Sequence, residues 1–175
     1  DGIIYLGSFS KMFAPGFRIG WALAPDQITQ KLVVANETAI LTPSMAAEMS
    51  ISKYLHDFDW YAQVDKFRVM YRGRARATLE ALKKYLPDCT WTHPVGGFYT
   101  WVHFSDGINT NAMLPRAVQN LVAYVSGTAF YADGRGSDYL LIAYCYPPEE
   151  QIREGIRRLA VTVEQEKALI AVSYT

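Results

Sequence analysis

Two short apolar runs with a polar loop between them constrain the start of this fold most strongly. The runs are residues 3–6 and 21–24, and each has the length and composition of a buried strand. The loop between them contains Ser8, Ser10, Lys11 and Arg18. We therefore expect Lys11 to lie on a turn beside two core strands, where loss of hydration favours its neutral amine.

The side chains of this loop match one kind of ligand. A neutral lysine amine is a nucleophile that can condense with a carbonyl group. Ser8 and Ser10 offer hydroxyl donors, and the planar guanidinium of Arg18 suits a phosphate. Taken singly, such a lysine is usually a solvated surface residue and such serines usually belong to a turn. Their combination favours a phosphate-bearing aldehyde, of which pyridoxal 5'-phosphate is the common biological example.

The spacing of the loop also resembles a known motif. It reads Ser-Phe-Ser-Lys, three residues, then Pro-Gly-x-Arg-x-Gly. This resembles the lysine signature of the class I/II aminotransferases, the fold-type I pyridoxal-phosphate enzymes, and is most similar to the branch with 2-aminoadipate aminotransferase and MocR-type regulators. The resemblance implies that Lys11 forms the Schiff base with the cofactor. It also implies that Ser8 and Arg18 hold the cofactor phosphate, with Ser10 assisting.

The resemblance implies an α/β fold, the C-terminal part of the fold-type I transferase. Residues 1–56 are expected to be a remnant of the large cofactor-binding domain. Residues 57–175 are expected to form a long linking helix and a small C-terminal α/β domain. In the family, most strands of the large parallel sheet precede this lysine, as do the aspartate that binds the pyridine nitrogen and the aromatic that stacks on the ring. The 175 residues alone are therefore expected to be inactive.

The spacing of apolar residues predicts helices and strands independently of the resemblance to a family. Apolar residues recur every three or four positions over residues 59–86, which predicts one long amphipathic helix. Strands that alternate with helices over residues 90–171 describe a small α/β domain. The remaining expected helices are 25–41, 45–55, 109–121 and one from 147 onward, and the expected strands are 90–92, 98–102, 122–125 and 139–146.

Two positions bear on the substrate. Gly97 lies in a Pro-Val-Gly-Gly segment that also matches the family, and it either contacts substrate or serves a tight turn. Most amino-acid aminotransferases of the family carry an arginine in the last strand that clamps the substrate α-carboxylate, whereas Leu141 stands at that position here. Three explanations stay open: a substrate without an α-carboxylate, a cation from elsewhere in the protein, or lost transaminase activity. Arg135, on the preceding loop, is either a substitute or a turn residue.

Composition excludes several other functions. With 17 basic and 17 acidic residues the net charge is zero, so no overall field attracts nucleic acid or a membrane surface. Cys89 and Cys145 are far apart and lack ligand spacing, so we expect neither a disulfide nor a metal site. Neither a signal peptide nor a membrane span is recognisable, which favours a cytoplasmic protein.

The sequence thus predicts the C-terminal portion of a pyridoxal-phosphate-dependent aminotransferase. Such an enzyme moves an amino group between a small-molecule amino donor and a 2-oxo acid, and family members are commonly homodimers. Two alternatives stay open. One is the effector-sensing, aminotransferase-like domain of a MocR-type transcription regulator, and the other is a lyase or decarboxylase that uses the same cofactor and lysine.

Overall fold

The computed structural model describes residues 2–173, and the chain forms two compact units. The first is Asp1–Lys66 and the second Phe67–Thr175, so the division falls within the long helix α3, Trp60–Tyr85. Sequence reasoning placed the domain boundary at residue 56, before this helix. The assignment of the first part to a larger cofactor-binding domain stays a prediction.

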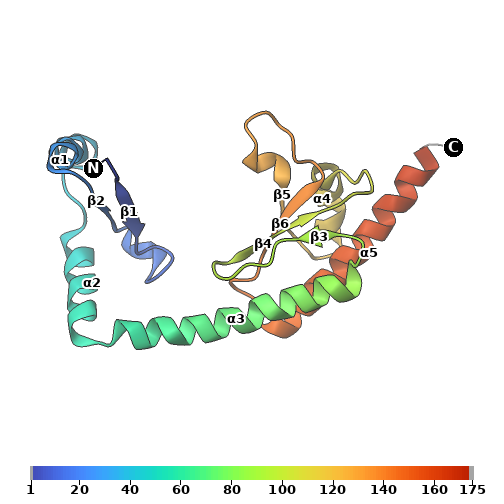
Figure 1. The fold of residues 1–175 in the computed structure, drawn as a ribbon, viewed down its shortest axis with the longest axis horizontal. Coiled ribbons are helices and arrows are strands. Elements are labelled where there is room, and N and C mark those ends of the chain that lie inside the picture. The colour runs from blue at the N-terminus through green and yellow to red at the C-terminus, as the bar shows by residue number, and fades with distance from the viewer. Residues whose placement is uncertain (1, 174–175) are drawn as a thin grey trace. The chain divides into compact units, whose positions relative to one another are not determined.

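The first unit contains an antiparallel strand pair, β1 and β2, joined by the loop that carries Lys11 (Figure 1). Tyr5 pairs with Leu23 at one end of the register and Ser8 with Gly20 at the other. Ser44 begins α2, where its hydroxyl accepts a hydrogen bond from the backbone N–H of Ala47. The elements of this unit are β1 Tyr5–Ser8, the short 3-10 helix η1 Pro15–Phe17, β2 Gly20–Leu23, α1 Asp26–Ile40, α2 Met45–Asp57 and the first turns of α3.

The expectation that β1 and β2 are core strands is wrong for this chain. Leu6 is 71% exposed and Leu23 is 68% exposed. The two strands form a sheet of their own, to which no further strand of the described residues is added. Helix α1 likewise has no buried residue among those described. An apolar run shows that a strand can be buried, but a covering layer decides whether it is.

The second unit is built on a four-stranded antiparallel sheet with the strand order β3-β4-β6-β5 (Figure 1). Side chains alternate across a sheet, so Val102 of β4 and Leu140 of β6 share one face. Both are fully buried, in one cluster with residues of α3, α4 and α5. The elements of this unit are β3 Thr90–Trp91, β4 Tyr99–His103, α4 Thr110–Gln119, β5 Val125–Ser126, the 3-10 helix η2 Gly127–Phe130, β6 Tyr139–Ala143 and α5 Glu149–Ser173, with the rest of α3.

The helices of this unit agree well with the sequence. In α5, Ile152, Ile156, Leu159 and Val163 are all buried, as their spacing predicts. Asn109 caps α4 by accepting hydrogen bonds from two backbone N–H groups of its first turn.

Three strands are shorter than predicted, β3 by one residue and β5 and β6 by more. β5 forms only at Val125–Ser126, because Leu121 has a φ of 59° and the N–H of Val122 bonds to the carbonyl of Ala117. This turn at the end of α4 leads the chain away from the sheet before it joins β6. β6 itself ends at Ala143 instead of residue 146.

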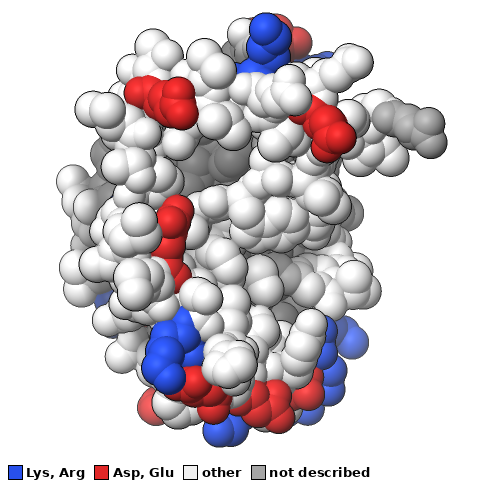
Figure 2. All heavy atoms as spheres, turned by 90° about the vertical axis from the view of Figure 1, so that its left-hand side faces the viewer, with Lys and Arg blue, Asp and Glu red and all other residues white. Residues whose placement is uncertain are grey.

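Charged side chains of both signs occur on the surface (Figure 2). On the face shown in Figure 2, uncharged residues cover most of the area, and basic and acidic side chains lie next to each other where they gather. None of the helices in the described part of the chain is long and apolar enough to cross a membrane. Among residues 2–173, no three His, Cys, Asp or Glu side chains lie close enough together to hold a metal ion.

Candidate active site

Backbone hydrogen bonds fold the lysine loop into a compact turn. The N–H of Phe9 donates to the carbonyl of Ile19 at 3.1 Å and extends the β1–β2 ladder by one step. The carbonyl of Phe9 then accepts from both Phe13, at 2.8 Å, and Ala14, at 3.1 Å. Lys11 lies in the middle of this turn, so its place beside the end of β1 is fixed by main-chain geometry.

Three of the predicted site residues come together on this loop. The hydroxyl of Ser8 accepts a hydrogen bond from the N–H of Ser10 at 3.1 Å. The guanidinium of Arg18 donates through Nη1 to the hydroxyl of Ser10 at 3.4 Å and to the carbonyl of Pro15 at 3.3 Å. The spacing of the motif therefore brings the Arg18 guanidinium to the hydroxyl of Ser10, whose backbone in turn binds the hydroxyl of Ser8.

Arg18 has an unusual backbone. It ends η1 with a φ of 55° and a ψ of 35°, the left-handed region that side chains other than glycine rarely occupy. Such a conformation costs roughly 1–2 kcal/mol. Strained residues of this kind cluster at ligand sites, where the strain directs a side chain. In this loop the left-handed backbone of Arg18 directs its guanidinium toward the Pro15 carbonyl and the Ser10 hydroxyl, to which it donates hydrogen bonds.

Lys11 is exposed, which corrects the expectation that apolar strands remove its hydration. The expectation fails because the neighbouring strands are themselves uncovered. Within the described residues, no hydrogen bond or ion pair engages the Lys11 ammonium. No acidic residue occurs in the sequence from residue 2 to residue 25, so Lys11 and Arg18 give this segment a charge of +2. An uncompensated pair of cations favours an anionic ligand.

A cluster of aromatic rings supports the far side of the loop, a feature that sequence reasoning missed. The ring of Phe13 lies edge-on to that of Phe17, with centroids 5.3 Å apart, and to that of Tyr54 of α2, 5.0 Å apart. Trp60, at the start of α3, is the fourth ring of the group, and its centroid lies 6.0 Å from that of Phe13. These contacts anchor the turn that carries Lys11. The only sequence signal was the density of aromatics near residues 13–17 and 54–60.

The two residues connected with substrate lie in the second unit. Gly97 has a φ of 82°, and a Cβ there would meet no atom within 4 Å. The turn itself thus accounts for the glycine, and contact with substrate stays a prediction. Leu141 is half-buried on β6, paired with Trp101 of β4 and with Val125 of β5.

Arg135 does not replace the missing arginine in this structure. Its guanidinium lies over the ring of Tyr131, 4.8 Å from the centroid, and 3.4 Å from the carboxylate of Asp133. The side chain is largely exposed, which fits a turn residue better than a buried clamp.

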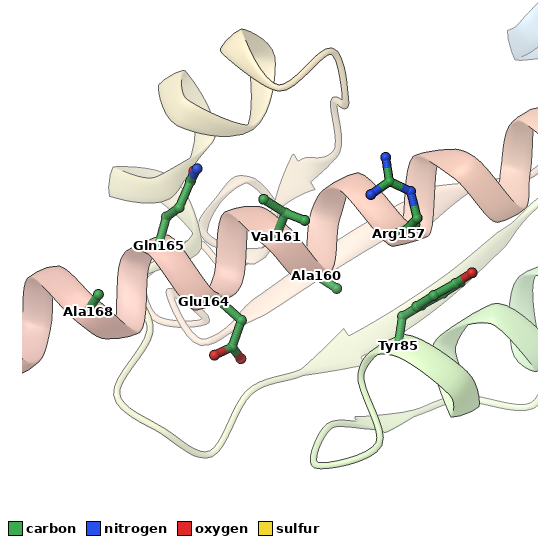
Figure 3. A pocket seen from close by; sticks show the side chains of 7 residues that line it. All are labelled: Tyr85, Arg157, Ala160, Val161, Glu164, Gln165 and Ala168. Atoms are coloured by element: carbon green, nitrogen blue, oxygen red, sulfur yellow. The ribbon is translucent and has the colours of Figure 1, made fainter.

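A hollow of about 500 Å³ on α5 has a different character (Figure 3). Its lining is mostly apolar, with Ala160 and Val161 on α5 and Tyr85 at the end of α3. The one cation there, Arg157, already binds Glu154 through two hydrogen bonds of 2.7 and 2.8 Å. The lysine loop is therefore the stronger candidate.

A family model described as aminotransferase class I and II matches residues 1–159. The chain belongs to the class I and II aminotransferases. Aromatic-amino-acid aminotransferase 1 of Thermococcus litoralis is 40% identical, over 94% of this chain and 40% of its own length. The 2-aminoadipate transaminase of Thermus thermophilus is 35% identical, over 97% of this chain and 43% of its own length. The chain therefore spans about two fifths of these relatives.

A solved aminotransferase has the same fold. The crystal structure of LysN, the α-aminoadipate aminotransferase of Thermus thermophilus, superposes with a TM-score of 0.90 at 35% identity. The match covers 95% of this chain and 43% of LysN, and that structure is a complex with N-(5'-phosphopyridoxyl)-L-leucine. Membership of the family and the fold-type I architecture are both confirmed.

Membership implies pyridoxal phosphate, and the lysine loop has the donors for it. Ser8, Ser10 and Arg18 provide two hydroxyls and a guanidinium on one loop, where the guanidinium bonds to the Ser10 hydroxyl and the Ser10 N–H bonds to the Ser8 hydroxyl. The two cations of the loop have no carboxylate partner in the segment from residue 2 to residue 25. This donor set fits a phosphate dianion, and the exposed Lys11 amine fits an aldehyde.

Proposed function

We propose that this chain is part of a pyridoxal-phosphate-dependent aminotransferase that moves an amino group between an amino donor and a 2-oxo acid. The observation that carries the proposal is the lysine loop, which bears an exposed amine, two hydroxyls and a guanidinium in a segment without a carboxylate. Family membership supports the reaction class.

Some residues of this chain would bind the cofactor, and Lys11 would also transfer the proton. Arg18 and Ser8 would hold the cofactor phosphate, with Ser10 orienting the guanidinium. Pyridoxal phosphate, when bound, supplies a reactive aldehyde and an electron-accepting ring. Lys11 would hold the cofactor through Nζ, and the same amine would take a proton from the substrate Cα as general base and return it as general acid.

The proposal can be tested in the complete polypeptide that contains these residues. Reconstitution with pyridoxal phosphate should give a visible absorbance band, and this band should be lost in Lys11→Ala. The matched control is Lys53→Ala, because the Lys53 side chain on α2 is largely exposed and pairs with Asp57 of the same helix. An unchanged band in Lys11→Ala would remove Lys11 from the mechanism. Turnover of amino donors that depends on a 2-oxo acid then tests the reaction itself.

The substrate question centres on Leu141. Neither Leu141 nor Arg135 provides a carboxylate clamp in the second unit. Two amino donors that differ only in the presence of the α-carboxylate should therefore have similar kcat/KM values. The exception is a cation outside residues 1–175 that binds this carboxylate. Leu141→Arg separates these cases. It should raise kcat/KM for the carboxylate donor alone if the clamp is missing, and leave it unchanged if another cation already binds that group.

A homodimer is the assembly we propose for the complete protein, since family members commonly share active sites between subunits. Sedimentation of the complete protein at several concentrations would test it. The regulator alternative has less support, because YdfD of Bacillus subtilis, an HTH-type transcriptional regulator, is only 26% identical, against 40% and 35% for the two transaminases.

A further inference from the structure

The ring of Tyr54 connects helix α2 to the lysine loop. Its centroid lies 5.0 Å from that of Phe13, with the two ring planes at 76°, which is the edge-to-face geometry that aromatic pairs prefer. Tyr54 follows the buried Ile51 by three residues, so the two side chains lie on one face of α2. The buried face of this helix therefore carries Tyr54 to the loop.

Phe13 receives this contact at a point of the loop that bears on both Lys11 and Arg18. Its N–H donates to the carbonyl of Phe9 at 2.8 Å and so closes the turn that contains Lys11. Its ring lies 5.3 Å from that of Phe17, the residue directly before the left-handed Arg18. A displacement of Phe13 would thus move the Lys11 turn and the Arg18 guanidinium together.

Little other packing fixes the loop within the first unit. Among residues 2–66, only Ala47 and Ile51 are buried, and both lie on α2. The rings that meet at Phe13 are half-buried. Because this unit has no larger core among the described residues, these ring contacts decide where the loop lies against α2.

The contact depends on the ring of Tyr54 and not on its hydroxyl. No hydrogen bond engages this hydroxyl among residues 2–173. On its other side the ring stacks on that of Phe58, with centroids 4.9 Å apart and planes at 22°. Phe58 is 60% exposed, and its ring forms no aromatic contact with Phe13 in the described part of the chain. Phe58 therefore shares the stacking of Tyr54 without the contact to the loop.

We propose that Tyr54 is a positioning residue for the cofactor site. Through Phe13 and Phe17 it holds the Lys11 amine and the Arg18 guanidinium in the geometry that binds pyridoxal phosphate. The inference rests on the proposed function, because it concerns the same loop. A residue with this role affects cofactor binding and the proton transfer by Lys11, but not the affinity for the amino donor.

Ligand binding to the complete polypeptide tests the positioning directly. Tyr54→Leu should weaken the binding of pyridoxal phosphate, and that of inorganic phosphate to the cofactor-free protein, by about 3- to 10-fold each. Tyr54→Phe keeps the ring and should restore both affinities. The matched control, Phe58→Leu, removes a ring that does not contact Phe13 and should stay within about twofold of the parent. Unchanged affinity in Tyr54→Leu, or equal losses in Tyr54→Leu and Phe58→Leu, would overturn the proposal.

Turnover separates positioning from a role in stability alone. Per bound cofactor, Tyr54→Leu should lower kcat by about 10- to 100-fold and leave KM for the amino donor unchanged, because a small displacement of a catalytic group has an effect of this size. A parental kcat per bound cofactor would refute the proposal. A parent protein that binds no pyridoxal phosphate would refute the proposed function as well, whereas a parent that binds it and is insensitive to Tyr54→Leu would refute this inference alone.

A double variant tests whether Tyr54 acts through Phe13. Phe13→Leu removes the other half of the contact, so the double variant with Tyr54→Leu should bind pyridoxal phosphate no more weakly than the weaker single variant. Losses that multiply in the double variant would show that Tyr54 does not act through Phe13. Circular dichroism establishes that each variant is folded, and Tyr54→Met, which also lacks a ring, serves for both comparisons where Tyr54→Leu does not fold.

Discussion

The guanidinium of Arg18 donates a hydrogen bond to the hydroxyl of Ser10 across eight residues of chain. At 3.4 Å this bond is long, so a phosphate oxygen would displace it at little cost and form a stronger, charge-assisted bond. The guanidinium is already held beside Ser10 and the carbonyl of Pro15 before any ligand arrives. Binding of a phosphate would then cost less conformational entropy, because the Arg18 side chain is already ordered.

Two substitutions of Arg18 distinguish the strain of its backbone from the contribution of its guanidinium to cofactor binding. Arg18→Gly and Arg18→Ala both remove the guanidinium and should weaken cofactor affinity equally, by roughly 10- to 150-fold for a lost hydrogen bond to a charged group. Glycine accepts a φ of 55° and alanine does not, so Arg18→Gly should be more stable than Arg18→Ala by about 1 kcal/mol. Urea unfolding and cofactor titration of the complete protein measure the two effects. Identical unfolding midpoints would show that the loop relaxes and stores no strain.

A second prediction concerns the contact between η2 and the chain that leads into β6. A Cβ at Gly127 would lie 2.3 Å from the carbonyl oxygen of Gly136 and 2.7 Å from the Cβ of Tyr139. Neither atom belongs to a flexible side-chain end, so Gly127→Ala should lower the free energy of unfolding by about 1–3 kcal/mol. Gly96→Ala, where a Cβ meets nothing within 4 Å, should stay within about 0.5 kcal/mol of the parent. Equal effects of the two substitutions would contradict this account.

Thr110 is the centre of a third prediction. Its buried hydroxyl donates to the carbonyl of Tyr139 at 2.6 Å, and its own carbonyl accepts from the hydroxyl of Tyr124 at 2.6 Å. Thr110→Val keeps the shape but leaves the Tyr139 carbonyl without this donor, at a cost of about 1–3 kcal/mol in unfolding free energy. Thr90→Val removes only an exposed hydrogen bond of 3.4 Å to His103 and should change stability little. Denaturant melts of both variants make the comparison, and a neutral Thr110→Val would mean that water replaces the lost donor.

Local pattern was enough to predict the helices and the lysine loop. Repeats of three and four residues placed α3 and α5 correctly, because a helix buries whichever face is apolar. The proximity of Ser8, Ser10 and Arg18 followed from a short motif, since all three lie on one loop closed by local backbone bonds.

Features that depend on distant residues were not predictable in the same way. The exposure of Lys11 and of β1 depends on what covers them, which an apolar run does not encode. The length of β5 was overestimated because Val-Ala-Tyr-Val has a strand composition, whereas the positive φ of Leu121 sets where pairing begins. A non-glycine residue in that conformation has no clear sequence signal.

The thiol of Cys89 gives a last prediction, in its dependence on pH. Burial is the main cause that raises its pKa, to about 11; Lys167 opposes this rise, and the carboxylates of Asp106 and Asp88 add to it. Because the folded-state pKa lies above that of an ordinary thiol, about 8.5, the neutral thiol favours the fold at lower pH, and this contribution is lost as pH rises toward 11. Only the thiolate is alkylated, so at pH 8 Cys89 should react roughly 100-fold more slowly in the folded chain than in urea, and tenfold faster for each unit of pH up to 11. Iodoacetamide labelling followed by mass spectrometry, in a Cys145→Ser background, measures these rates. Lys167→Met removes a cation that lowers this pKa and should slow labelling further. Equal labelling rates at pH 8 in the folded and unfolded chain would show that the thiol is not desolvated.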